Sequence, residues 1–186
     1  IEILPGGVVT KKAAAHIQLD ENGEFVRNPK EDLVKVAVVE RHQGTGNVAC
    51  GFLKGYGIKE GAVALSVAHD SHNIIVVGVN DEEMEFAVNS LIAQEGGIVL
   101  VKEGKVIEQM PMPIAGLMSD QSGEWVDEKL TSIHEKAYTE LGICGDVEPV
   151  MTLCFMSLAV IPEIKLTDMG LFDVTTFSFI PVEISR

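Results

Sequence analysis

Three apolar runs constrain the fold of this chain more than any other feature of its sequence. Residues 33–39 are rich in β-branched side chains, and residues 62–68 and 74–79 form two further apolar runs. Side chains of this kind favour strands, and runs this apolar predict strands buried within a sheet, with residues 33–39 central. Residues 69–73 (HDSHN) separate the second run from the third. We therefore expect this polar loop to emerge at one end of the sheet.

An amphipathic helix is predicted directly after the third run. Asn80 is a good N-cap, Glu83 stands three residues later as in a capping box, and acidic residues suit the positive end of the helix dipole. The apolar positions recur at intervals of three and four residues and predict one buried face, made of Met84, Ala87, Val88, Leu91 and Ile92.

The remaining pattern predicts a hairpin, two helices and a last strand. Residues 98–102 and 105–109 flank a two-residue turn, and residues 124–141 have helical periodicity. Residues 151–160 predict a short buried helix, and residues 177–184 alternate as a strand does. The fold class that we expect is mixed α/β, of α+β-like character, with a central mixed sheet covered by two to three helices.

Residues 41–59 contain many glycines, for which we expect a long ordered loop. Within it, residues 44–49 match the G-x-G-x-x-A pattern of dinucleotide-binding folds. That pattern requires a helix directly after the glycines, and further glycines disfavour one here. A plain glycine-rich loop and a nucleotide site are the two interpretations of this segment.

Residues 1–30 do not resemble an independent unit, because short β-type runs alternate with turn signals. We interpret them as an arm, or as the remnant of a preceding domain, and residues 31–186 as the main domain. The chain opens on Ile1 without an initiator methionine, which we interpret as a cut inside a longer protein.

Composition excludes several classes of partner. The formal net charge is -14, which argues against nucleic acids and anionic membrane surfaces. The longest uncharged apolar stretch, residues 150–161, is shorter than the roughly 20 residues that span a bilayer.

Three cysteines without a C-x-x-C pair favour reduced thiols and a cytoplasmic location. A mean hydropathy of +0.23 and several methionines predict an exposed apolar surface, through which copies of the chain would form a homo-oligomer.

The polar loop holds the candidate catalytic residues His69, Asp70 and His72, whose side chains hold, donate or accept protons. Three interpretations stay open from the residues alone: a turn stabilised by its own side chains, a loop that faces a ligand, or a metal site. A metal site is the weakest of these, since the sequence has neither His-x-His nor HExxH.

Three further residues are candidates for substrate binding: Arg41, His42 and Asn73. Arg41 suits a carboxylate, either within the protein or on a ligand, and an ordinary charge at a strand end is the alternative. No serine stands in a G-x-S-x-G elbow, so a serine hydrolase is not indicated.

Five ordered segments closely resemble the C-terminal domain of bacterial adenine deaminase, and the resemblance runs from about Ile3 to Pro181. The segments are residues 41–47 (RHQGTGN), 51–57 (GFLKGYG), 67–74 (VAHDSHNI), 111–119 (PMPIAGLMS) and 166–171 (LTDMGL).

This resemblance implies part of a metal-dependent amidohydrolase of purine metabolism. The complete enzyme is a hydrolase that converts adenine and water to hypoxanthine and ammonia, with Mn²⁺ or Fe²⁺ on an N-terminal β/α barrel. The barrel's metal ligands do not occur in this chain, so the resemblance implies no metal or other cofactor here. We expect the isolated chain to be inactive. The alternative function is a non-catalytic module that binds a purine or nucleotide.

Overall fold

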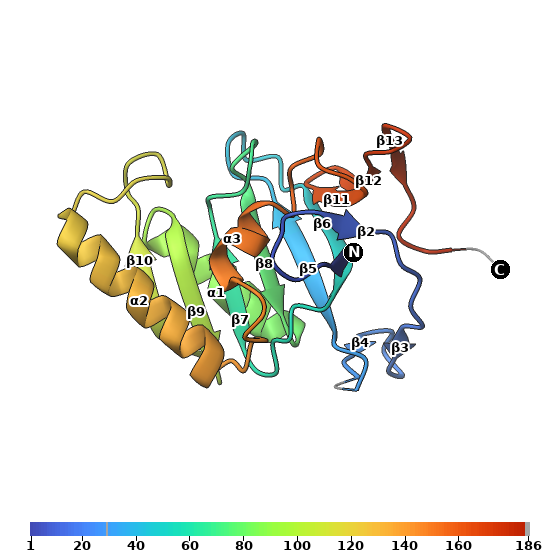
Figure 1. Cartoon of the computed structure of the whole chain (residues 1–186), viewed down its shortest axis with the longest axis horizontal. Helices are drawn as coiled ribbons and strands as arrows, with labels where there is room; N and C mark the ends of the chain where they lie inside the picture. Colours follow the sequence, from blue (N-terminus) through green and yellow to red (C-terminus); the bar gives the residue numbers. More distant parts are fainter. Residues whose placement is uncertain (29, 185–186) are drawn as a thin grey trace.

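The computed structural model describes residues 1–28 and 30–184, and a large mixed sheet forms its centre (Figure 1). Within these residues the sheet has eight strands in the order β10-β9-β7-β8-β5-β6-β1-β2. All neighbours are antiparallel except β1 and β6, which confirms the predicted mixed sheet. The strands are β1 (Glu2–Ile3), β2 (Thr10–Lys11), β5 (Leu33–Val39), β6 (Val48–Lys54), β7 (Ala62–Leu65), β8 (Ile74–Gly78), β9 (Gly97–Lys102) and β10 (Lys105–Pro111).

Three helices in the described residues cover this sheet, as predicted, and they lie on both of its faces. Helix α1 (Asp81–Ala93) lies behind the sheet in Figure 1, whereas α2 (Gly123–Thr139) and α3 (Pro149–Cys154) lie in front. The α1 face buries mostly small or β-branched side chains, and the other face buries larger ones against α2 and α3. In the described part of the chain, no helix combines the length and the apolar character that crossing a membrane requires.

Helix α1 begins as the sequence predicts, with the Asn80 side chain accepting a hydrogen bond from the amide of Glu83 at 2.8 Å. The Glu83 carboxylate instead accepts from the Gly104 amide in the β9–β10 turn, at 3.1 Å. Ile92, predicted to face the core, is 56% exposed, so this assignment was wrong. The helix needs only the narrower stripe of Met84, Ala87 and Leu91 to cover its part of the sheet.

Close packing of α1 on the sheet depends on small residues in the strands below it. A Cβ at Gly78 would lie 2.5 Å from the Met84 Cγ and 3.0 Å from the Ala62 Cβ. Any larger residue at Gly78 would therefore push the helix away from the sheet.

The predicted long loop at residues 41–59 is wrong in part, because β6 occupies Val48–Lys54 and pairs with the whole of β5. Gly51 is buried in this strand, and a Cβ there would stand 3.6 Å from the Leu166 side chain. A glycine therefore marks a closely covered strand here rather than a turn. The predicted helix at residues 151–160 is also shorter, since α3 ends at Cys154.

Two small sheets complete the fold. One pairs β3 (Gln18–Leu19) with β4 (Phe25–Val26), and the other contains β11 (Ile164–Thr167), β12 (Gly170–Asp173) and β13 (Ser178–Ile180). The β11–β12 hairpin was not predicted, and the predicted last strand is limited to β13. Strands β11 and β12 pack beside β6 and add Leu166 to the main core.

One half-buried carboxylate, that of Glu108, attaches α2 to the edge strand β10. Glu108 accepts hydrogen bonds from Lys129 at 2.8 Å and from Ser132 at 2.5 Å, and Lys136 lies 3.1 Å away. Burial alone would raise the pKa of Glu108, but these donors outweigh it and lower the pKa to about 2. The three donors stand at helical spacing on one face of α2, so a single acid fixes the helix.

We predict that Glu108→Gln destabilises the fold by on the order of 2 kcal/mol at pH 7. The folded pKa lies below the ordinary value of 4.5, so the stabilisation is complete above that pH and is lost as the pH falls toward 2. Urea unfolding at pH 7 and pH 3 checks this. The difference in the free energy of unfolding between wild type and variant should be smaller at pH 3. Glu128→Gln, an exposed position on the same helix, is the control. A difference in the free energy of unfolding that does not depend on pH would contradict the role given to the Glu108 carboxylate.

Candidate functional site

Strand directions bring three of the distinctive sequence segments to one edge of the main sheet. The chain leaves β5, β7 and β10 at this edge and re-enters it at β6, β8 and β9. The loops after β5, after β7 and after β10 therefore lie together, at the upper edge in Figure 1. Residues 41–47, 66–73 and 111–119 meet here, although they are distant in sequence.

Arg41 joins these three loops. Its Nε donates to the carbonyl of His72 at 2.5 Å, and its Nη2 donates to the carbonyl of Ala115 at 2.9 Å. Gly116 has φ near +73°, and a Cβ there would lie 2.9 Å from the Arg41 Nη1. The guanidinium thus requires glycine at this turn. Both of these hydrogen bonds hold backbone, so Arg41 acts as a clamp in this structure.

His42 and Asn73 also hold the loop. The Nε2 of His42 lies 2.7 Å from the carbonyl of Ser71, and the side chain of Asn73 accepts from the Arg41 amide at 3.3 Å. Asn73 is buried, so its amide group is directed into the protein. The three predicted substrate-binding residues are therefore brought together, and the contacts they make fix the shape of the polar loop.

His69 and Asp70 are presented outward by this framework. The His69 side chain is 35% exposed and the Asp70 side chain 84%, and their nearest charged atoms stand 4.0 Å apart. The His69 amide donates to the carbonyl of Cys154 at 2.9 Å, and its ring packs 4.8 Å from that of Phe155 at the end of α3. A partly covered imidazole and a free carboxylate thus stand side by side at the sheet edge.

His72 lies beneath these two residues. Its ring stands 5.4 Å from that of His69, and its Nδ1 is buried without a hydrogen-bond partner among the described residues. Burial first, and then the neighbouring His69 and Arg41, lower the pKa of His72. The neutral imidazole is therefore favoured at pH 7, which suits a hydrogen-bonding role.

The three predicted catalytic residues are thus close together, but they do not form a metal centre. No group of three or more His, Cys, Asp or Glu side chains in the described residues is arranged to hold a metal ion. What the cluster offers is a carboxylate acceptor and an imidazole that donates or accepts. Such groups recognise a polar molecule with donors and acceptors along its edge.

The dinucleotide interpretation of residues 44–49 fails on geometry. The segment runs directly into β6, so no helix N-terminus stands where a pyrophosphate would bind.

Glu40 is a site residue that sequence reasoning missed. Its carboxylate accepts from the amides of His42 at 2.5 Å, Gln43 at 2.8 Å and Thr45 at 3.0 Å. These backbone donors, with that of Thr45 first, lower the pKa of Glu40 to about 2. An acid just after a strand and before a glycine-rich turn was the available signal, since such a turn leaves several amides unpaired.

Comparison with known proteins gives a match to the family described as "Adenine deaminase C-terminal domain" over residues 7–178. Adenine deaminase 2 of Desulfotalea psychrophila is 70% identical over 98% of the chain. The adenine deaminases of Ligilactobacillus salivarius and Halalkalibacterium halodurans are 49% and 47% identical over 99% of it. The chain spans about a third of the length of these relatives, with 32%, 32% and 31% of each covered.

Glu40 provides a test of the loop framework. We predict that the amide resonances of His42, Gln43 and Thr45 titrate together with a midpoint near pH 2, because one carboxylate accepts from all three. NMR spectra recorded from pH 6 down to pH 1 measure this. In Glu40→Gln the shared titration should disappear. Glu31→Gln is the control, at an exposed position before the start of β5, and should retain the shared titration. Separate midpoints for the three amides would refute a common acceptor.

Proposed function

Because the chain belongs to the adenine deaminase C-terminal domain family, we propose that it serves as the C-terminal domain of an adenine deaminase. The complete enzyme would hydrolyse adenine to hypoxanthine and ammonia. A preceding domain would hold Mn²⁺ or Fe²⁺, which when bound supplies an activated water for the attack. This domain would contribute no metal ligand.

The observation that carries the proposal is the presentation of His69 and Asp70 by a rigid frame. Arg41, His42 and Asn73 use their contacts to hold backbone, so the loop is ordered before any ligand binds. Preorganised polar groups bind or orient a partner at a lower entropic cost than mobile ones. A loop that needed only to turn would not require this framework.

We infer that the loop faces the mouth of the catalytic domain and encloses the purine there. The Asp70 carboxylate suits the amino group of adenine as an acceptor, and the His69 imidazole suits a ring nitrogen or a catalytic side chain. The competing role is a loop that only seals the contact between the two domains. Kinetics of the complete enzyme separate these roles.

A location in the cytoplasm and a homo-oligomeric state also belong to the proposal. All three cysteines are free thiols in the structure, two of them exposed, and reduced cysteines suit a reducing compartment. Exposed apolar side chains such as Met118 and Phe86 support association between copies. Light scattering of the complete enzyme measures the oligomeric state.

We predict that the isolated chain releases no ammonia from adenine in the presence of Mn²⁺ or Fe²⁺. The physical reason is that the described residues supply no set of ligands for the metal that would activate water. A coupled ammonia assay measures this, with the complete enzyme as the positive control. Turnover by the purified chain would place the active site within it and would sink the proposal.

We predict that His69→Ala and Asp70→Asn in the complete enzyme each lower kcat/KM for adenine more than tenfold, or about 1.4 kcal/mol. The side chains face outward, so their loss removes contacts to the ligand or to a catalytic group rather than to the core. Metal content should not change, because neither side chain belongs to a metal site. Steady-state kinetics and metal analysis measure the two quantities.

The control for these substitutions is Asp127→Asn on α2, which makes the same chemical change at an exposed position. It should retain the wild-type kcat/KM. Wild-type rates in both loop variants would reject the role in purine binding, and sealing of the contact between the two domains would be the remaining role.

A further inference from the structure

The hairpin formed by β12 and β13 exposes aromatic side chains to solvent. Phe177 is 75% exposed and Phe179 is 51% exposed, and both rings pack against the nearly buried Phe172, at 5.3 Å and 5.2 Å. We call the β12–β13 hairpin with these three side chains the aromatic hairpin. Exposed aromatic clusters of this kind are typical of the centres of protein interfaces.

The backbone of Phe177 adds a second, independent indication. Its φ is +50°, a left-handed conformation that disfavours a bulky side chain and suits glycine or asparagine. Within this domain its ring gains one edge-to-face contact, with Phe172, and stays largely exposed. That contact offsets part of the backbone cost, and burial of the exposed ring by a partner would offset the rest.

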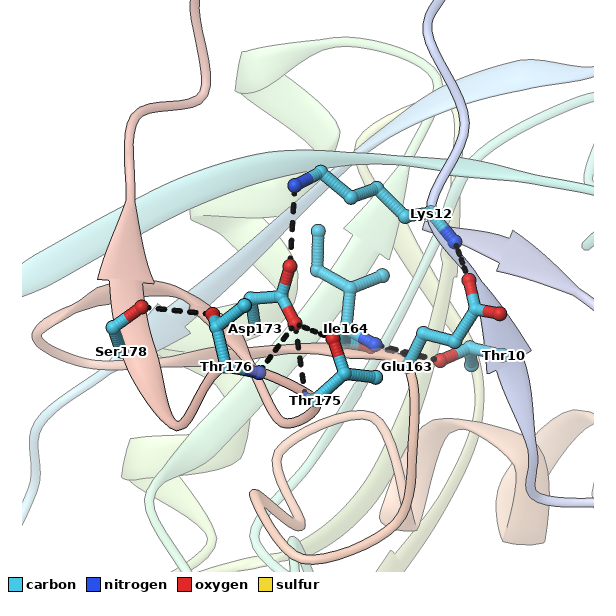
Figure 2. Close-up of polar contacts among 8 residues, drawn as sticks. All are labelled: Thr10, Lys12, Glu163, Ile164, Asp173, Thr175, Thr176 and Ser178. Atoms are coloured by element: carbon cyan, nitrogen blue, oxygen red, sulfur yellow. Dashed lines mark hydrogen bonds and ion pairs between the residues drawn. The ribbon is translucent and has the colours of Figure 1, made fainter.

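The N-terminal segment is attached to this same hairpin, as Figure 2 shows. Lys12 pairs with Asp173 at 3.1 Å, and its amide donates to the Glu163 carboxylate at 2.9 Å. Thr10 donates to the carbonyl of Ile164 at 2.8 Å from a buried position. Asp173 also accepts from Thr175 in the β12–β13 turn. The first residues of the chain and the hairpin are thus parts of one assembly.

Ile1 completes this arrangement. It lines a groove of about 640 Å³ together with Leu171 of β12 and Ile184 near the other end of the chain. The start of the chain and strand β12 thus line one groove. The relatives are about three times as long as this chain, so the part of them that it does not match has the size of a further large domain.

We propose that the aromatic hairpin docks on the catalytic domain that precedes this chain in the same polypeptide, an inference that rests on the proposed function. One short segment, residues 154–156, connects the His69 loop with β11, which pairs with β12 of the hairpin. The His69 amide donates to the carbonyl of Cys154, and the Leu166 amide of β11 donates to the carbonyl of Met156 at 3.0 Å. Docking at the hairpin would thus constrain the position of the polar loop through this segment.

Hydrogen exchange measured by mass spectrometry tests the docking. Amides of residues 174–180 should exchange at least tenfold more slowly in the complete enzyme than in the 186-residue chain at equal concentration. Equal exchange in the two proteins would overturn the proposal. Protection in the short chain that grows with its concentration would also overturn it, because it would assign the hairpin to a second copy.

Phe177→Asn in the complete enzyme provides the matching variant. Asparagine suits the backbone at φ +50°, so the thermal stability of the 186-residue chain should be equal or higher, while protection of residues 174–180 in the complete enzyme should be lost. Ile92→Asn, at another exposed apolar position on α1, should retain protection. Retained protection in Phe177→Asn would refute a role for this ring.

Adenine turnover by the same wild-type preparation separates the two proposals. A protected hairpin in a protein that does not deaminate adenine would support docking and reject the proposed function. An active enzyme with an unprotected hairpin would reject the docking alone.

Discussion

Burial of the central strands on both faces is the constraint on which the rest of the structure depends. Strands β7 and β8 are buried at every position, and β5 is buried at most positions. A sheet of this kind needs a layer on each side, because its strands have no face that tolerates water. The α1 layer uses small side chains and Gly78 for close approach, and the opposite layer uses larger side chains of α2, α3 and β11.

Double burial also decides where polar chemistry is possible. Strands β7 and β8 contain no charged residue, and charged groups gather where the chain turns between the buried strands. At the edge that follows β5, β7 and β10, Arg41 satisfies backbone carbonyls of two neighbouring loops, and Glu40 satisfies amides of its own loop. The two side chains fix loops that cannot form a regular ladder, and His69 and Asp70 are thereby left free to act outward.

Sequence patterns predicted the strands at β5, β7 and β8, the capped start of α1 and the β9–β10 hairpin, because each has a strong local signal. Strand β6 and the β11–β12 hairpin were missed, since Gly51 and Gly170 suggest turns unless the residues that pack against them are known. The site residues were predicted as a group, but not their division of roles. That Arg41 and Asn73 hold backbone depends on partners such as Ala115, 74 residues away from Arg41 in sequence.

Residues whose conformation or contacts do not stabilise the isolated domain are the most informative about its function. His72 has a buried nitrogen without a partner among the described residues, and Phe177 combines exposure with an unfavourable backbone angle. Each feature departs from what folding alone would favour, and departures of this kind gather at functional sites. Residues 154–156 link the polar loop to the small sheet that carries the hairpin. The proposed docking makes use of this connection, since the hairpin and the polar loop would then be positioned against the same catalytic domain.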